Sequence, residues 1–120
     1  MGNLPRDLLE LKSKFPNGHS HFIPLCLEEM ALHSKKNADY AQGGDPLGNF
    51  KRVSDMLNSW GINISPATVA LIYMMKQVDA VGRMIGKGYE GGVEGVGSRL
   101  QDIGVYAKLC AILVGEEKNE

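Results

Sequence analysis

The chain has 120 residues, with 13 Lys and Arg against 14 Asp and Glu, 43% apolar residues and 7% aromatic residues. A chain of this length fits one domain and buries roughly two thirds of the surface that its unfolded state exposes. The net charge of −1 argues against a general nucleic-acid-binding protein, because phosphate binding needs a clear excess of cationic side chains. The mixture of apolar and charged residues also excludes a chain of disordered composition.

The sequence predicts a cytoplasmic protein without a membrane segment. No apolar run reaches the roughly 18 residues that span a bilayer, and the first residues are too charged for a signal peptide. Cys26 and Cys110 have neither metal-ligand spacing nor a Cys-x-x-Cys pattern. We interpret both as reduced, buried thiols, the alternative being a disulfide.

Glycine and proline divide the first half of the chain into three predicted helices. The first covers residues 4–14 and ends at a proline- and glycine-containing turn. The second covers about residues 21–41, because apolar residues recur there at three- and four-residue spacing. The third begins at Asp45 and Pro46, which resemble an N-cap and a first helical residue, and runs to Trp60.

The next helix has the clearest start in the sequence. Ser65 can cap its first turn, and Pro66 suits the first helical position. The segment runs to about residue 85 and is apolar almost all round, which is typical of a bundle centre or a subunit interface. Six of the twelve residues over 86–97 are glycine, which predicts a flexible loop.

The last predicted helix covers residues 98–114, and a solvated tail follows over 115–120. No segment shows the sustained alternation of a half-buried strand. We therefore predict a single all-α domain over residues 1–120, with its core in about residues 20–114. Because most connections are short, four to five helices should pack as an antiparallel bundle.

Charged side chains on the predicted helix that begins at Ser65 suggest a site, because burying an unpaired charge is costly. Four polar residues stand close together there: Lys76, Gln77, Asp79 and Arg83. Asp79 lies three residues after Lys76 and four before Arg83, which places these three on one face. One interpretation is that this face lines a functional site. The other is an intrahelical charge stripe that faces water.

Two other helices carry similar stripes. On the last helix, Asp102 lies three residues after Arg99 and four before Tyr106. The second helix carries two neighbouring stripes, which consist of Glu29, His33, Lys36 and Tyr40, and of Glu28, Lys35 and Asp39. Acids from several helices can hold Mg²⁺, which usually shares its ligands with substrate phosphates. Nearby cations can neutralise such phosphates.

Several of these segments resemble one family. The stretches are 27–30, 35–41 and 44–50, together with Lys76–Asp79 and Arg83 on the central helix and Asp102–Tyr106 on the last. The most specific motif is Lys-Asn-x-Asp-Tyr over 36–40. Together they resemble the MazG-like, all-α nucleotide pyrophosphohydrolases, in particular the small phage and prophage proteins of this type. The resemblance covers about residues 22–114.

The resemblance implies a commonly oligomeric protein, expected here as a homodimer or homotetramer in the cytoplasm (of the host, if the chain is phage-encoded). The implied reaction is hydrolysis of a nucleoside or deoxynucleoside triphosphate to a monophosphate and pyrophosphate, with Mg²⁺ or alternatively Mn²⁺ as cofactor. Glu29, Asp79 and Asp102 would hold the metal. Asp39, with Glu29, would serve catalysis by joining the metal ligands or by orienting the attacking water.

The resemblance also implies which residues contact the triphosphate. Lys36, Asn37, Tyr40, Lys76 and Arg83 would bind its phosphates or its nucleoside. Better-known relatives carry a second acid before the residue that corresponds to Asp102, whereas residues 97–101 contain none. The alternative hypothesis is therefore a non-catalytic helical module on the same scaffold that binds nucleotides or another protein.

Overall fold

A computed structural model describes residues 4–41 and 44–119 of the chain. These residues form five helices and no strand, so the predicted all-α fold is confirmed. The helices are α1 (Leu4–Lys14), α2 (Phe22–Ala41), α3 (Gly48–Ser59), α4 (Pro66–Lys87) and α5 (Val96–Lys118). Among the described helices, none combines the length and apolar character needed to cross a membrane.

The predicted start of α4 is confirmed in detail. The Ser65 hydroxyl accepts a hydrogen bond from the backbone N–H of Thr68 at 3.2 Å, and Pro66 occupies the first helical position. This arrangement satisfies one of the N–H groups that the first turn leaves without a helical partner. The helix ends at Gly88, whose φ of 68° is the left-handed conformation that glycine adopts most readily.

The start of α3 differs from the prediction. The helix begins at Gly48, and Asp45 and Pro46 lie in the turn before it. The Asp45 carboxylate accepts a hydrogen bond from the backbone N–H of Leu47 at 2.9 Å. Asp45 therefore stabilises the approach to the helix, as aspartate commonly does in turns, and is not its N-cap.

The last helix is longer than predicted at both ends. It begins at Val96 and continues to Lys118, so most of the expected tail is helical and the glycine-rich connection shortens to residues 88–95. Tertiary contacts explain the extension. The Glu117 carboxylate accepts a hydrogen bond from the backbone N–H of Ala67 at 3.1 Å, and Glu116 lies 3.5 Å from the ammonium of Lys51.

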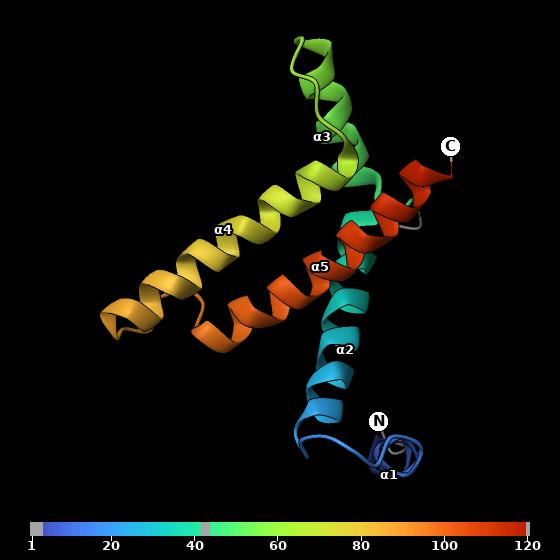
Figure 1. Ribbon diagram of the computed structural model, residues 1–120, viewed down its shortest axis with the longest axis vertical. Helices are drawn as coiled ribbons and strands as arrows, with labels where there is room; N and C mark the ends of the chain where they lie inside the picture. Colours follow the sequence, from blue (N-terminus) through green and yellow to red (C-terminus); the bar gives the residue numbers. More distant parts are fainter. Residues whose placement is uncertain (1–3, 42–43, 120) are drawn as a thin grey trace.

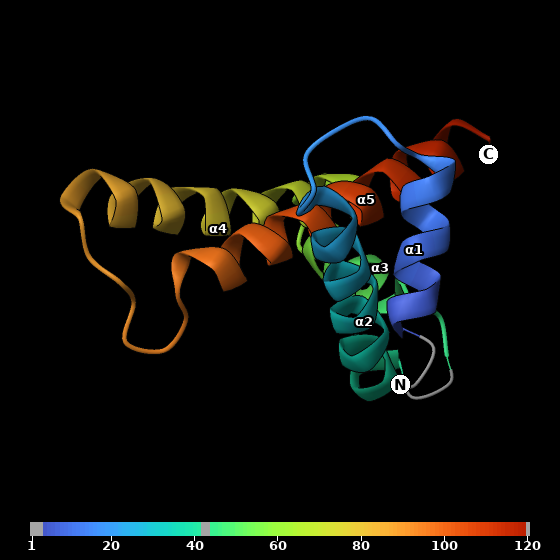
Figure 2. The same cartoon turned by 90° about the horizontal axis from the view of Figure 1, so that it is seen from below.

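The helices form an open arrangement around one antiparallel pair. α4 and α5 lie side by side as a hairpin, and α2 crosses α5 (Figures 1 and 2). α3 packs mainly against α4, while α1 contacts only α2. The half of the hairpin around the 88–95 connection extends beyond the other helices in both views.

The hydrophobic core lies where α3, the first half of α4 and the second half of α5 meet. Its buried members are Leu47, Phe50, Ala67, Val69, Ala70 and Leu113. The rings of Phe50, Tyr73 and Tyr106 pack against one another with centroid distances of 5.7 to 6.3 Å, in tilted and edge-to-face geometries. Cys26 and Cys110 are free thiols, and both are only partly buried, which differs from the burial expected for them.

Candidate functional site

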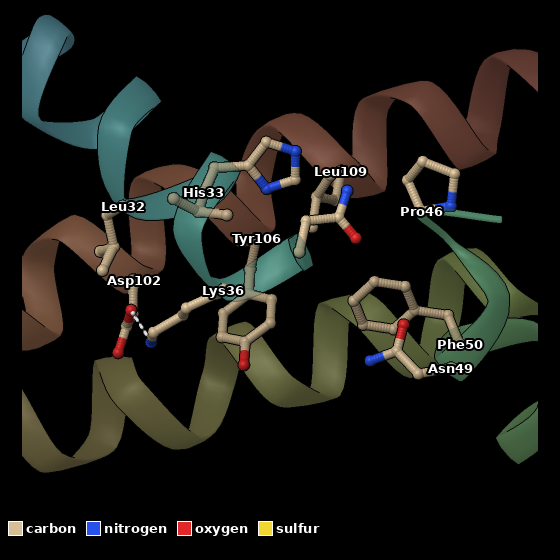
Figure 3. Close-up of a pocket in the computed structure, with 11 residues that line it drawn as sticks. Leu32, His33, Lys36, Pro46, Asn49, Phe50, Asp102, Tyr106 and Leu109 are labelled. Carbon is tan, nitrogen blue, oxygen red and sulfur yellow. Dashed lines mark hydrogen bonds and ion pairs between the residues drawn. The ribbon is translucent and has the colours of Figure 1, made fainter. Parts of the chain in front are cut away.

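A cavity opens at the junction of α2, the start of α3 and α5 (Figure 3). It is lined by Leu32, His33, Lys36, Asn37, Pro46, Asn49, Phe50, Asp102, Val105, Tyr106 and Leu109. Three segments that are distant in the sequence therefore contribute to one site. Its lining combines an apolar and aromatic wall with several hydrogen-bonding groups, as small-molecule sites commonly do.

Asp102 is the buried acid of this cavity, with a residue exposure of 5%. The Lys36 ammonium donates to its Oδ1 at 3.0 Å, and the Gln77 amide donates to its Oδ2 at 3.3 Å. Lys36 comes from α2 and Gln77 from α4, so the carboxylate of α5 is held by both neighbouring helices. Such partners are needed because an unpaired buried carboxylate would be costly.

The polar contacts continue along the α4–α5 hairpin beyond Asp102. The Arg99 guanidinium donates from one Nη to the Gln77 side-chain oxygen at 2.8 Å, and the same nitrogen lies 3.8 Å from the Glu94 carboxylate. Among the described side chains, the Nε of Arg99 is the buried polar atom without a hydrogen-bond partner. A network of Lys36, Asp102, Gln77, Arg99 and Glu94 thus connects α2, α4, α5 and the 88–95 connection.

The opposite wall of the cavity is aromatic. Tyr106 and Phe50 line it with their ring centroids 6.3 Å apart, and the side chains of His33 and Asn49 lie around them (Figure 3). Ring faces can contact a planar group, and the imidazole and amide groups can donate or accept hydrogen bonds. With the charge of Lys36 and a volume of about 60 Å³, the cavity can enclose part of a ligand that has both a flat apolar part and an anionic part, with the remainder outside.

The structure brings together three of the sequence-predicted site residues. Lys36, Asn37 and Asp102 all line the cavity. Glu29 lies further along α2, where it pairs with the Lys108 ammonium and its carboxylate lies against Gly104 of α5. Glu29 lines a separate apolar groove between α2 and α5 and does not line the cavity that contains Asp102.

The three charged residues of α4 lie outside the cavity. Lys76, Asp79 and Arg83 are exposed, and the Asp79 carboxylate is 3.9 Å from the Arg83 guanidinium within the same helix. The residue that α4 directs toward Asp102 is Gln77, next to Lys76 in the sequence. Within this chain, these three charges therefore match the second interpretation of the sequence, a charge stripe that faces water.

The remaining two predicted residues belong to the last turns of α2. Asp39 is exposed and does not line the cavity. The side chain of Tyr40 lies outside the described part of the structure. The α2 motif therefore places its Lys36 and Asn37 at the cavity, while Asp39 lies on a more exposed side of the same helix.

The three carboxylates expected to hold a metal do not form one group in this chain. Asp102 is paired with Lys36, Glu29 with Lys108 and Asp79 with Arg83. Over residues 4–41 and 44–119, no group of three or more His, Cys, Asp or Glu side chains is placed to hold a metal ion. The arrangement of this chain thus supplies one of the three expected carboxylates, Asp102, to the cavity.

Asn49 and Phe50 were not singled out individually from the sequence, although both lie in the 44–50 segment. His33 shares a helical stripe with Lys36, so its position was accessible from the spacing alone. Gln77 was one of the four polar residues noted on α4, but its contact with the buried acid was not expected. The helical period does not show which side of an almost wholly apolar helix faces its neighbours.

Comparisons with protein-family models, with curated proteins and with solved structures found no match to this chain.

Proposed function

We propose that this protein binds a nucleoside or deoxynucleoside triphosphate in the cavity between α2, α3 and α5 and hydrolyses it to a monophosphate and pyrophosphate. One observation carries the proposal. A buried carboxylate, Asp102, is paired with the ammonium of Lys36 inside a cavity that also contains aromatic rings and amide groups. Lys36 and Asn37 belong to the motif with the most specific family resemblance.

Lys36 is suited to bind phosphate because it is the mobile partner of the pair. Its side chain is 44% exposed, whereas that of Asp102 is 7% exposed. A lysine has a flexible stem, so its ammonium can move from the carboxylate to an incoming phosphate over a short distance. Asn37, Asn49 and His33 add hydrogen-bonding groups, while Phe50 and Tyr106 offer ring surfaces to the base.

Mg²⁺, or Mn²⁺ in its place, would enter this site with the triphosphate. Magnesium is usually bound by one or two carboxylates together with substrate phosphates and water, and Asp102 is the carboxylate at the cavity. When bound, the ion would polarise a phosphoryl oxygen. A contribution of Glu29, Asp39 or Asp79 to the metal or to water activation stays a prediction.

Nucleotide binding without turnover is the second candidate function. It is favoured by the observation that both oxygens of Asp102 accept hydrogen bonds from nitrogen donors. A carboxylate held in this way can position Lys36 for a phosphate without any metal. The same cavity would then bind the triphosphate but release no pyrophosphate.

We also propose that the protein acts in the cytoplasm as a homo-oligomer, a dimer or a tetramer. The free state of both cysteines is consistent with a reducing compartment. Large apolar side chains are exposed on α2, α4 and α5, and another copy of the chain would cover some of them.

The decisive experiment combines calorimetric titration with a pyrophosphate-release assay over a panel of canonical and modified triphosphates, with Mg²⁺ and with Mn²⁺. We expect at least one triphosphate to bind and to release pyrophosphate. Asp102→Asn should abolish release, and Lys36→Met should weaken binding at least tenfold. Asp55→Asn, an exposed acid on α3, is the matched control and should behave as wild type.

The results separate the candidate functions. Binding without pyrophosphate release would support the non-catalytic module, and the absence of any binding would contradict both functions. Asp79→Asn supplies further information, because its carboxylate lies outside the cavity in this chain. A loss of release in this variant would show that the active arrangement recruits Asp79.

A further inference from the structure

The binding of a triphosphate would remove one of the hydrogen bonds that hold Asp102. Lys36 would move its ammonium from Oδ1 of Asp102, which is 3.0 Å away, to a phosphate. The Asp102 side chain is only 7% exposed, so little of it is open to water. Because an unpaired buried carboxylate is costly, the departure of Lys36 would be resisted unless another group continues to hold Asp102.

Gln77 holds the second oxygen of the same carboxylate. Its side-chain nitrogen donates to Oδ2 of Asp102 at 3.3 Å, whereas Lys36 donates to Oδ1. Gln77 is half-buried and does not line the cavity, so a ligand can bind there without displacing it. The hydrogen bond to Oδ2 can therefore persist while the partner of Oδ1 is exchanged.

The amide of Gln77 supports a carboxylate only in one orientation. Its nitrogen donates and its oxygen accepts, so the reverse orientation would place two acceptors against each other at Asp102. Arg99 excludes the reverse orientation, because its guanidinium has donors only and one Nη donates to the Gln77 oxygen at 2.8 Å. A hydrogen bond from a charged donor is the stronger of the two contacts, so Arg99 determines which way the amide points.

Arg99 has its closest contact with Gln77. The same Nη lies 3.8 Å from the Glu94 carboxylate, which is beyond hydrogen-bond distance. The Nε of Arg99 is buried without a hydrogen-bond partner among the described side chains. An unsatisfied buried nitrogen costs free energy, so this orientation of the guanidinium needs a compensating contact. The hydrogen bond to Gln77 is such a contact.

We infer that Arg99 and Gln77 form a positioning pair, which holds Asp102 by its Oδ2 while Lys36 passes from Oδ1 to the substrate phosphate. Neither residue of the pair lines the cavity, so both act through Asp102 and not on the substrate. Without the pair, Asp102 would retain the ammonium that the phosphate needs. The effect on triphosphate binding rests on the proposed function, whereas the hold on Asp102 does not.

A direct attraction between Arg99 and Asp102 is the competing explanation. The two charges lie three residues apart on one face of α5 and attract each other whether or not Gln77 is present. The positioning pair instead requires the amide between them. The two explanations therefore make opposite predictions for a protein that lacks this amide.

The first test needs no nucleotide. Urea denaturation followed by circular dichroism gives the midpoints of Arg99→Met, Asp102→Ala and the double variant. Members of one hydrogen-bond network are not additive, so the double variant should shift the midpoint by less than the sum of the single shifts. In a Gln77→Met background the two shifts should add. The same shortfall in that background would overturn the inference in favour of direct attraction, and additive shifts in both backgrounds would overturn it as well.

The second test is calorimetric titration with Mg²⁺ and a non-hydrolysable analogue of the triphosphate that binds the wild type most tightly. Arg99→Met and Gln77→Met should each weaken binding by about tenfold, a loss of ordinary size for a hydrogen-bond network. Arg99→Lys keeps a donor and should bind within about threefold of the wild type. Gln101→Met is the matched control and should bind as wild type, because the Gln101 amide donates to the Glu28 carboxylate at 2.9 Å outside the cavity.

A Lys36→Met background tests the exchange itself. No ammonium then moves from Asp102 to the phosphate, so Arg99→Met should weaken binding no further. A second tenfold loss in this background would contradict the inference, as would wild-type affinity in both Arg99→Met and Gln77→Met. If the wild type binds no triphosphate, the proposed function fails, and the denaturation test alone decides whether the pair holds Asp102.

Discussion

The two halves of the α4–α5 hairpin differ in what they bury. The half that contacts α3 encloses apolar side chains, among them Phe50, Val69 and Leu113, which are almost wholly inaccessible. The projecting half buries Val81 and Met84 beside the polar contact between Gln77 and Arg99, and leaves other large apolar side chains exposed. The first half is a finished core, whereas the second combines a small apolar interior with polar contacts.

The contrast also explains the location of the candidate site. Asp102 lies between the two halves, where Lys36 of α2 reaches the hairpin. On one side of it are the aromatic rings of the core, and on the other is the polar network of the projecting half. A ligand bound there would contact a rigid apolar wall and a group of charges that two helices hold in place.

The largest effect is expected in the finished core. Phe50→Ala removes a ring that is 2% exposed and contacts both Tyr73 and Tyr106. It should lower the free energy of unfolding by about 3 to 5 kcal/mol, because the lost burial leaves a cavity. Urea denaturation followed by circular dichroism measures this change. Trp60→Ala, at a 65% exposed aromatic, is the control, and a comparable loss there would contradict the contrast.

A smaller effect is expected at the tip of the projecting half. A Cβ on Gly91 would lie 2.2 Å from the backbone oxygen of Glu94, whereas a Cβ on Gly92 would meet nothing within 4 Å. Gly91→Ala should therefore distort the 88–95 connection and cost about 1 to 3 kcal/mol, as overpacking usually does. Thermal unfolding would measure it, and an equal response of Gly92→Ala would contradict a specific steric cause.

The smallest effect concerns the ion pair at the edge of the core. The Lys51 ammonium, 2.7 Å away, and the backbone N–H of Leu47 hold the pKa of Asp45 below its usual value of 3.8. A depressed pKa in the folded state stabilises the fold above the usual value, and this contribution is lost as the pH falls through the depressed one.

Asp45→Asn should therefore lower the melting temperature slightly at neutral pH, and the difference from wild type should vanish in strong acid. Melting curves between pH 7 and pH 2 measure this convergence. Asp55→Asn, which replaces an exposed acid on α3, is the matched control for the loss of one carboxylate. A difference at Asp45 that persists unchanged in acid would exclude the ion pair as its cause.

Local sequence signals predicted a helix boundary correctly where the residues next to that boundary determine it. Ser65 and Pro66 define the start of α4 through a side-chain cap and a fixed backbone angle. The end of α5 could not be predicted in this way. Residues 115–118 look like a solvated tail, and they are helical where Glu116 and Glu117 find partners on α3 and at the start of α4.

At the candidate site, too, some features could be predicted from the sequence and others could not. The spacing of Arg99, Asp102 and Tyr106 on α5 correctly placed them on one face, and in the structure Asp102 and Arg99 of this face contact α4. On α4, spacing correctly placed Asp79 and Arg83 on one face, but it did not reveal that this face is exposed. An almost wholly apolar helix offers no contrast by which to choose its buried side, so tertiary packing decides.

The contact between Glu117 and the backbone N–H of Ala67 joins residues that are 50 positions apart in the sequence. It joins the two helices of the α4–α5 hairpin at the end opposite the 88–95 connection. The two helices are therefore held together at both ends. Because each helix end loses a partner when the other opens, we expect the first turn of α4 and the last turn of α5 to fray together. Glu117 thus couples the two helix ends that lie farthest from the 88–95 connection.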